Sequence, residues 1–461
     1  MRTVFLKLFI LLYILSSNFS TVYGENFEIT SYNKEITPKM ELIDENVTLD
    51  ILGESAILMD ASTGEILYEK NMNEQLYPAS ITKLMTVLLA FEYGNLDDTV
   101  VFSESAIFGI ERNSSHIALD VGEELTLEQC LYAILLQSAN EASLGVAEHI
   151  GGSKEGFADM MNKKAKELGC LNTHFVNPNG LHDNNHYTSA YDMALIAKEV
   201  LKYDKFRDII KTIRYEIPPT NIQPETRYLY AQHQMIKPPS IYVYDGCLGG
   251  KTGFTNEALN TLVTYAKKGD TTLIAVVLKD SGANTYVDTK TLFDYGFANY
   301  KTVEALPSST VDTTANITQE YKNKSFDVGN INISNGQAVY DTIKISDSTP
   351  SYTEKINLYE NIKPTINEGD VVGTVDVYKD NTFVGSSTLN ATEKLDAFTD
   401  EELSEKYNDR IKDTIFKILK YIVIAIVIIF LILIILRIIV VRRRRKKQRR
   451  FMQKRNRFDR M

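Results

Sequence analysis

The chain of 461 residues carries 50 Lys and Arg against 60 Asp and Glu, for a formal net charge of −10 at pH 7. Its last twenty residues hold twelve Lys or Arg and one Asp, so the rest is strongly acidic and gives no reason to expect a nucleic-acid partner. The three cysteines, Cys130, Cys170 and Cys247, are too few for a disulfide scaffold, so hydrophobic cores must supply the stability.

The N-terminus has the layout of a secretory signal peptide. Arg2 and Lys7 precede an apolar run at Leu8–Leu15, and small and polar residues then lead to Gly24. The run is too short to cross ~30 Å of hydrocarbon comfortably, so an uncleaved anchor is the weaker alternative. We therefore predict a signal peptide at residues 1–24 and a polar leader or linker at residues 25–49.

Residues 50–300 predict a domain in which helices pack against an antiparallel sheet. Two short β-type runs surround a turn at Gly64, and two longer runs cover residues 261–265 and 272–278. Between them, helical spacing predicts helices at residues 81–93, 125–150, 156–168 and 191–202. Strands at both ends with helices between them indicate an α/β or α+β fold whose sheet joins the two ends of the domain.

Composition changes after residue 300. Residues 303–394 are rich in Thr, Val, Ile, Asn and Ser, with short alternating runs such as Val371–Val377 and no good helical pattern. This pattern predicts a small all-β second domain that resembles a β-sandwich. Residues 395–413 are charged and helix-prone, and we predict that they form a stalk.

The C-terminal part has the pattern of a membrane anchor. Residues 421–441 are almost wholly Ile, Val, Leu and Phe, and 21 helical residues reach about the thickness of the bilayer core. Arg437 lies near enough to the basic end for its side chain to reach the headgroups. Residues 442–461 predict a basic cytoplasmic tail that attracts anionic lipids, with the domains before the span outside the cell. Nucleic-acid binding by this tail is the weaker interpretation, because the tail is short and abuts the span.

Three short motifs occur in the order Ser80-Ile81-Thr82-Lys83, Ser138-Ala139-Asn140 and Lys251-Thr252-Gly253. Together they supply a nucleophile, a base, proton-relay groups and an anion-binding strand, which are the parts of a serine acyl-transfer enzyme. Each motif alone has an ordinary structural interpretation, as a helix start, a polar helix break or a turn. Their order and wide spacing favour the catalytic interpretation.

The first two motifs predict the groups that move protons. Ser80 is the predicted nucleophile and Lys83 its general base, because one helical turn places both on the same face. Lys83 can act as a base if burial and a nearby positive charge, such as that of Lys251, lower its pKa. Ser138 and Asn140 are predicted to relay a proton to the leaving group and to hold the substrate amide.

The third motif predicts substrate binding. Lys251 and Thr252 can bind a carboxylate, and Gly253 allows the backbone to approach closely. The backbone N–H of Phe254, together with that of Ser80, is a predicted oxyanion donor.

No cofactor and no metal site are predicted. His174, His182 and His186 occur close together, but their spacing matches no metal signature. We expect structural or hydrogen-bonding roles for them.

The motifs and their surroundings resemble the low-molecular-mass penicillin-binding proteins, the serine-type D-alanyl-D-alanine carboxypeptidases of bacterial cell walls. The resemblance covers about residues 50–300, with a weaker match in the second domain. It is carried by Ser55–Asp60 with Thr63-Gly64, Pro78–Thr86, Gln137–Ser143, Asn177–Leu181, His186-Tyr187 with Ala190–Ala194, and Asp245-Gly246 with Gly250–Thr255.

The resemblance implies a β-lactamase/transpeptidase-like fold, acylation of Ser80, removal of the terminal D-alanine of peptidoglycan stem pentapeptides, and inhibition by β-lactams. The chain departs from the family pattern in two places. A full membrane span replaces the usual amphipathic C-terminal helix, and residues 281–290 lack the arginine expected to help bind the substrate.

Two alternative functions stay open at this point. A β-lactamase shares all three motifs but typically uses a loop Glu for deacylation, and residues 177–186 offer Asp183 and no Glu. A membrane-bound β-lactam receptor or wall-binding protein with little turnover would fit the single span, although the tail is too short for a signalling domain.

Overall fold

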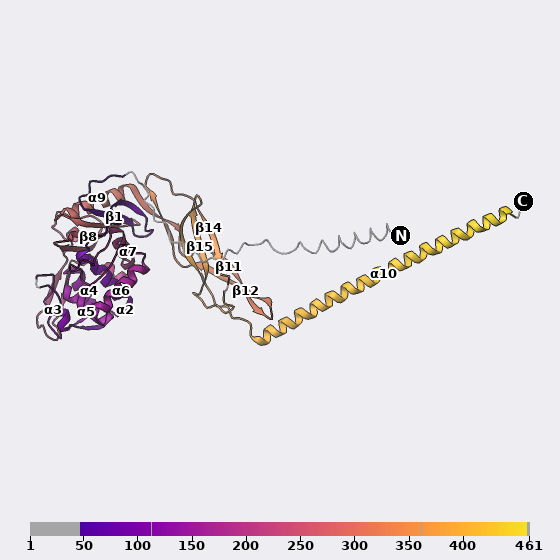
Figure 1. Ribbon diagram of the computed structural model, residues 1–461, viewed down its shortest axis with the longest axis horizontal. Coiled ribbons are helices and arrows are strands. Elements are labelled where there is room, and N and C mark those ends of the chain that lie inside the picture. The colour runs from indigo at the N-terminus through magenta and orange to yellow at the C-terminus, as the bar shows by residue number, and fades with distance from the viewer. Residues whose placement is uncertain (1–46, 112, 361, 459–461) are drawn as a thin grey trace.

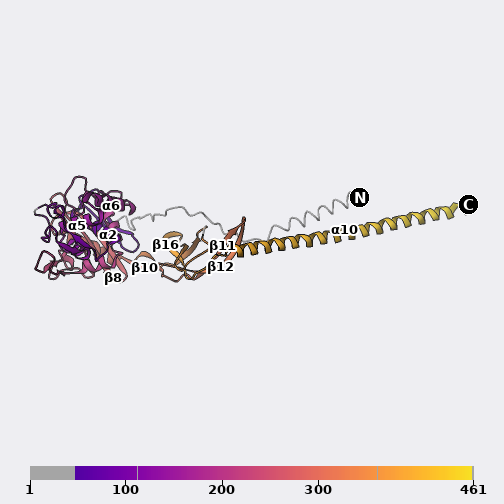
Figure 2. The ribbon, with the colours of Figure 1, turned by 90° about the horizontal axis from the view of Figure 1, so that it is seen from below.

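The structure, a computed structural model, describes residues 47–458 apart from residues 112 and 361. It consists of a helix-rich body, a sheet-rich body and a long helix that extends away from both (Figure 1, Figure 2). The predicted signal peptide at residues 1–24 and nearly all of the predicted leader at residues 25–49 lie outside the described residues.

A five-stranded antiparallel sheet forms the centre of the first body, in the strand order β2-β1-β9-β8-β7. The strands are β1 (Ser55–Asp60), β2 (Ile66–Lys70), β7 (Cys247–Thr255), β8 (Leu259–Lys268) and β9 (Thr271–Asp280). Ser55 of β1 pairs with Leu278 of β9. The sheet therefore joins the two ends of the domain.

Both faces of this sheet are buried, because alternate residues of a strand point to opposite sides. In β1, Ile57 and Met59 belong to the core beneath the helical cluster, whereas Ala56 and Leu58 belong to a second core with α9 (Asn284–Asn299). The continuous apolar run of β1 is what a strand covered on both faces requires.

The helical cluster covers the face of the sheet opposite α9. Its helices are α2 (Lys83–Tyr93), α3 (Glu104–Phe108), α4 (Leu127–Leu136), α5 (Asn140–Gly151), α6 (Lys154–Glu167), α7 (Ala190–Val200) and α8 (Asp204–Lys211). Shorter elements complete the body: the pair β3 (Thr99–Val101) and β4 (Glu124–Thr126), the pair β5 (Arg214–Ile217) and β6 (Arg227–Tyr230), and the 3-10 turns η1 (Ala79–Thr82) and η2 (Gln234–Ile236).

The helix predicted at residues 125–150 is in fact two helices. Helix α4 ends at Leu136 and α5 begins at Asn140. Ser138 between them has a φ of 61°, a left-handed conformation that a right-handed helix does not contain. The residues on both sides have helical apolar periodicity, so the sequence pattern did not indicate the interruption. The interruption coincides with the second motif.

The second body contains two sheets. β10 (Tyr300–Leu306) pairs with β13 (Val339–Lys344), and a five-stranded sheet has the order β11-β12-β16-β15-β14. Its strands are β11 (Thr313–Tyr321), β12 (Lys324–Asn335), β14 (Tyr352–Leu358), β15 (Val371–Lys379) and β16 (Thr382–Ala391). One apolar core, which includes Ile317, Ile331 and Val375, lies inside this body.

Most of the predicted stalk (residues 395–413), the predicted span and the described part of the predicted tail form one continuous helix, α10 (Asp400–Phe458); residues 395–399 precede it. Among the described residues it is the one helix that is long and apolar enough to cross a membrane. Its first turns contact the second body: Leu403 is buried, and Arg410 Nη1 donates to the Ser325 carbonyl oxygen at 3.0 Å. The remaining length projects away from both bodies (Figure 1).

Candidate active site

Ser80 and Lys83 lie at the junction of η1 and α2. Ser80 is partly exposed, whereas Lys83 is completely buried at the first position of α2. Lys83 Nζ donates to Ser80 Oγ at 2.9 Å, to Asn140 Oδ1 at 2.7 Å and to the Asn179 carbonyl oxygen at 2.5 Å.

These three contacts suit a general base. A neutral amine has two protons and one lone pair, and Asn140 and Asn179 supply acceptors for the two protons. In that neutral form the lone pair faces Ser80 Oγ, so the contact that the ammonium donates becomes one that the Ser80 hydroxyl donates. Burial, followed by the charge of Lys251, holds the pKa of Lys83 well below its ordinary value, and the charge of Glu141 opposes this shift. The environment therefore favours the form of Lys83 that accepts a proton.

The second motif occupies the turn between α4 and α5. Ser138 and Asn140 are both buried, and Ser138 Oγ accepts a hydrogen bond from Lys251 Nζ at 3.0 Å. The left-handed backbone of Ser138 costs roughly 1–2 kcal/mol for a residue with a Cβ. The surrounding fold must offset this strain, which is of the kind that concentrates at functional sites.

Strand β7 brings the third motif next to Ser80. Lys251 Nζ donates to the Thr252 carbonyl oxygen at 2.7 Å, and burial lowers the pKa of Lys251 to about 7. A Cβ at Gly253 would lie 2.9 Å from the Ser80 backbone nitrogen, so only glycine permits this approach. Phe254 follows directly, with an exposed side chain, and its backbone N–H therefore lies on a segment that adjoins Ser80.

A loop behind Lys83 completes the surroundings of the base. Asn179 is buried and offers its carbonyl oxygen to Lys83. Gly180 has a φ of 79°, and a Cβ there would lie 1.9 Å from the Ala79 carbonyl oxygen. The sequence placed this loop in a block of family resemblance but gave it no catalytic role, since a backbone acceptor leaves no signature in side-chain chemistry.

The three clustered histidines do not converge on one point. His186 is buried, and its Nδ1 accepts a hydrogen bond from the Val176 backbone N–H. The ring proton is therefore on Nε2, which lies 2.8 Å from Thr82 Oγ1. Burial lowers the pKa of His186 to about 3, so it supports η1 as a neutral ring. His174 Nδ1 instead contacts the Asn185 carbonyl oxygen. No group of three or more potential metal ligands occurs among the described residues.

Glu141 is a site neighbour that the sequence did not identify. It is buried at the start of α5, and its Oε1 accepts from the Ile117 backbone N–H at 2.7 Å. The Asn140 backbone N–H donates to the Ser115 carbonyl oxygen at 2.9 Å. These two bonds hold the loop that carries Ser115 against the second motif. Burial raises the pKa of Glu141, and only the folded structure reveals that burial.

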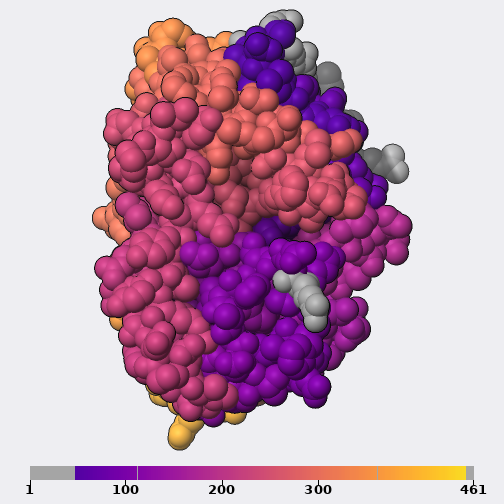
Figure 3. All heavy atoms as spheres, turned by 90° about the vertical axis from the view of Figure 1, so that its left-hand side faces the viewer, coloured from indigo at the N-terminus to yellow at the C-terminus, as the bar shows by residue number. Residues whose placement is uncertain are grey.

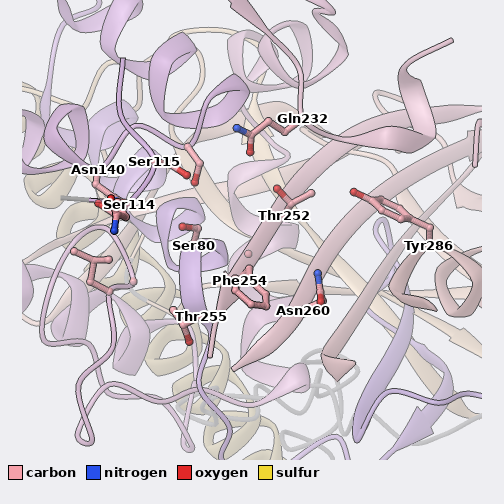
Figure 4. Close-up of a pocket in the computed structure, with 15 residues that line it drawn as sticks. Ser80, Ser114, Ser115, Asn140, Gln232, Thr252, Phe254, Thr255, Asn260 and Tyr286 are labelled. Atoms are coloured by element: carbon pink, nitrogen blue, oxygen red, sulfur yellow. The ribbon is translucent and has the colours of Figure 1, made fainter. Parts of the chain in front are cut away.

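The three motifs line one cavity of about 360 Å³. The space-filling view shows a hollow between the purple atoms of the helical part and the salmon atoms of later segments (Figure 3). Besides motif residues, the cavity lining includes Asn113, Ser114, Ser115, Gly180, Leu181, Gln232, Thr255, Asn260 and Tyr286. Figure 4 shows Ser80 with Thr252 and Phe254 in this cavity, and the side chains of Gln232 and Tyr286 on the Thr252 side.

Comparisons with known proteins point to one family. Residues 42–282 match the family model described as D-alanyl-D-alanine carboxypeptidase. The chain is 36% identical over 350 residues to the D-alanyl-D-alanine carboxypeptidase DacF of Bacillus subtilis, covering 74% of this chain and 85% of that protein. It is 30% identical over 338 residues to DacC of Escherichia coli, covering 69% of this chain and 78% of that one.

Solved structures agree with this relationship. Penicillin-binding protein 5 from Haemophilus influenzae superposes with a TM-score of 0.58 at 25% identity, over 76% of this chain and 99% of that chain. A mutant of the Streptomyces K15 DD-transpeptidase superposes with a TM-score of 0.51 at 28% identity, over 54% of this chain and 100% of that chain.

Proposed function

The chain belongs to the D-alanyl-D-alanine carboxypeptidase family of serine peptidases, and we propose that it carries out the family reaction through an acyl-enzyme on Ser80. The protein is thus a serine DD-carboxypeptidase, and its substrate is the terminal D-Ala-D-Ala of peptidoglycan stem pentapeptides. One observation carries the assignment of Ser80: the buried amine of Lys83 contacts Ser80 Oγ while two further acceptors fix its orientation.

In the acylation step, Lys83 Nζ takes the proton of Ser80, and Ser80 Oγ attacks the carbonyl carbon of the D-Ala–D-Ala peptide bond. The backbone N–H groups of Ser80 and Phe254 stabilise the negative charge that develops on the carbonyl oxygen. Ser138, held by Lys251, passes a proton to the nitrogen of the departing D-alanine as the C–N bond breaks, and it takes in exchange the proton that Lys83 received from Ser80, so that Lys83 is neutral again.

In the deacylation step, water attacks the ester carbonyl carbon of the acyl-enzyme. Lys83 accepts the proton of the water, and Ser80 recovers its proton as the C–O bond to the acyl group breaks. The peptide leaves with one D-alanine fewer. Asn140 holds Lys83 and is positioned to bind the substrate amide.

β-Lactam inhibition fits the same chemistry, because a strained cyclic amide acylates the serine and its amine cannot diffuse away. A membrane location is supported by α10, which is long and apolar enough to cross a bilayer. We place the catalytic body on the cell-wall side and the basic tail in the cytoplasm, where Arg and Lys are retained beside anionic lipids.

The test is D-alanine release from diacetyl-Lys-D-Ala-D-Ala by the full chain in detergent micelles, with Ser80→Ala as the matched variant. We expect release by the wild type and a loss of at least ~10³-fold in the variant, because the nucleophile is gone. Fluorescent penicillin should label the wild type covalently and leave Ser80→Ala unlabelled. A labelled Ser80→Ala protein would disprove the assignment of Ser80.

A further inference from the structure

One end of the active-site cavity is not used by the steps above. Thr252, Gln232, Asn260 and Tyr286 line this end, and Figure 4 shows Thr252 between Ser80 and Tyr286 in that view. The described residues that line the cavity include no Asp, Glu, Lys, Arg or His. A charged group of the substrate that enters here therefore meets hydroxyl and amide groups, with Lys251 buried behind Thr252.

Tyr286 is held rigidly in the first turn of α9. Its ring stacks on Tyr242, with centroids 5.1 Å apart and planes at 25°, and meets the buried His233 ring edge-on at 6.1 Å. Two aromatic contacts fix the ring plane, and with it the direction of the hydroxyl group. The hydroxyl points toward Thr252 in Figure 4.

The hydroxyl of Tyr286 is set up as a hydrogen-bond donor. A phenol carries one proton, which it can donate to an acceptor such as a carboxylate. Burial raises the pKa of Tyr286, which keeps that proton in place at neutral pH. Thr252 carries a second hydroxyl donor on the same wall of the cavity.

The proposed reaction decides which substrate group reaches this position. The carboxylate of the terminal D-alanine lies one residue beyond the scissile bond, within about 3.8 Å of chain length. Its binding group must therefore line the same cavity as Ser80, next to Thr252.

We propose that the Tyr286 hydroxyl joins that of Thr252, which the third motif already predicts to bind a carboxylate, in binding the terminal carboxylate of the substrate, and that Tyr286 is thereby a specificity-determining residue. This inference rests on the proposed function. It replaces the arginine that residues 281–290 lack with a neutral donor, which recognises the carboxylate by a charge-assisted hydrogen bond.

The test compares Tyr286→Phe with the wild type, both as full chains in detergent micelles. Two peptides are used: diacetyl-Lys-D-Ala-D-Ala and the same peptide with a C-terminal amide in place of the carboxylate. Losing one hydrogen bond to a charged group should lower kcat/KM for the free acid by about tenfold or more. We expect a higher KM for the free acid and little change in kcat/KM for the amide. The ratio of the two kcat/KM values should therefore fall by the same factor.

Tyr295→Phe is the matched control. It makes the same chemical change on α9, but its hydroxyl contacts Tyr300 at 3.1 Å, outside the cavity. It should leave the ratio of the two kcat/KM values unchanged. An unchanged ratio in Tyr286→Phe, or equal losses on both peptides with a lower melting temperature, would overturn the inference and leave a packing role.

Acylation by benzylpenicillin, which also carries a carboxylate, gives an independent readout. Tyr286→Phe should be acylated more slowly by a similar factor, and an unaltered acylation rate would contradict the inference. The acylation rate tests the role of Tyr286 in carboxylate binding even if the wild type releases no D-alanine. If the wild type releases no D-alanine, the proposed function is contradicted. If the wild type releases D-alanine but Tyr286→Phe discriminates between the acid and amide peptides as the wild type does, only the role of Tyr286 is contradicted.

Discussion

At the scale of single residues, the site depends on two buried lysines that are kept from full protonation. Lys83 and Lys251 are both buried, and burial is the largest cause of the lowered pKa of each. Lys251 also lowers the pKa of Lys83 through its charge. Glu141 acts in the opposite direction and raises it. The balance between these charges sets the pKa of Lys83 and, in the proposed mechanism, the pH range in which Lys83 can accept the proton of Ser80.

The first prediction concerns Glu141→Gln. Activity falls as the pH decreases through the pKa of Lys83, because only the neutral amine is a base. Removing the negative charge of Glu141 lowers that pKa, while the Gln side-chain carbonyl still accepts from the Ile117 N–H. The acid limb of the kcat/KM profile for D-alanine release should therefore move to lower pH.

Glu148→Gln is the control for this prediction. Glu148 lies on the same helix and accepts from Ser103 Oγ at 2.6 Å, away from the cavity. Its pH profile should match that of the wild type. An acid limb that stays in place or moves to higher pH in Glu141→Gln would refute the electrostatic role of Glu141.

At the scale of elements, the turn between β1 and β2 connects the two bodies. Asp60 Oδ2 accepts from Thr302 Oγ1 at 2.6 Å and from Thr342 Oγ1 at 3.0 Å. Thr302 lies in β10 and Thr342 in β13, so the first strand of the catalytic body is bonded to both strands of the small sheet. Glu65, at the end of the same turn, faces Asp341, Lys379 and Asp60.

Glu65→Gln should stabilise the junction at neutral and higher pH. Burial, followed by the charge of Asp341, raises the pKa of Glu65 to about 7. Between an unfolded-state pKa of about 4.3 and pH 7, the folded protein holds a proton that the unfolded chain has lost. The free energy of unfolding therefore contains a contribution that is present below pH ~4.3 and is lost as the pH rises through 7.

The measurement is thermal unfolding of the full chain in micelles between pH 5 and pH 8. The melting temperature of the wild type should fall more over this range than that of Glu65→Gln, which has no proton to lose. Glu69→Gln changes an exposed carboxyl on the same strand and should behave as the wild type does. Parallel curves for wild type and Glu65→Gln would show that Glu65 does not carry this pH dependence.

At the scale of the whole molecule, α10 separates catalysis from anchoring. Its 59 residues span about 88 Å, of which only the first turns contact the second body. The Tyr407 ring lies 5.9 Å from that of Tyr321, and Leu403 is buried. Nearly all the described side chains of α10 beyond these contacts are exposed, and the helix lies away from the catalytic body (Figure 1).

A chain that ends at residue 413 should therefore keep the D-alanine release of the full chain but no longer bind lipid vesicles. A chain that ends at residue 399 also loses the burial of Leu403, which contributes roughly 2 kcal/mol. Its second body should melt about 5 °C or more lower than that of the chain ending at residue 413. The checks are vesicle flotation, the release assay and calorimetry. Flotation of the chain ending at residue 413 would show that another segment anchors the protein.

The sequence by itself determined the chemistry and the broad architecture of this protein. The three motifs, the apolar strands and helices, and the apolar run at residues 421–441 are local patterns that need no knowledge of distant contacts. They sufficed for the confirmed fold class and for the enzyme class. The single helix predicted at residues 125–150 was wrong, because periodicity does not register the left-handed residue Ser138 that divides it.

Only the tertiary structure decided which distant groups surround Ser80 and Lys83. The Asn179 carbonyl on Lys83 joins positions 96 residues apart, and Lys251 meets Ser138 across 113 residues. Tyr286 lines the cavity from the first turn of α9, although α9 packs on the face of the sheet opposite the helical cluster. Burial lowers the pKa of Lys83, and it results from the packing of segments that are far apart in the sequence. A local run of residues therefore does not reveal it.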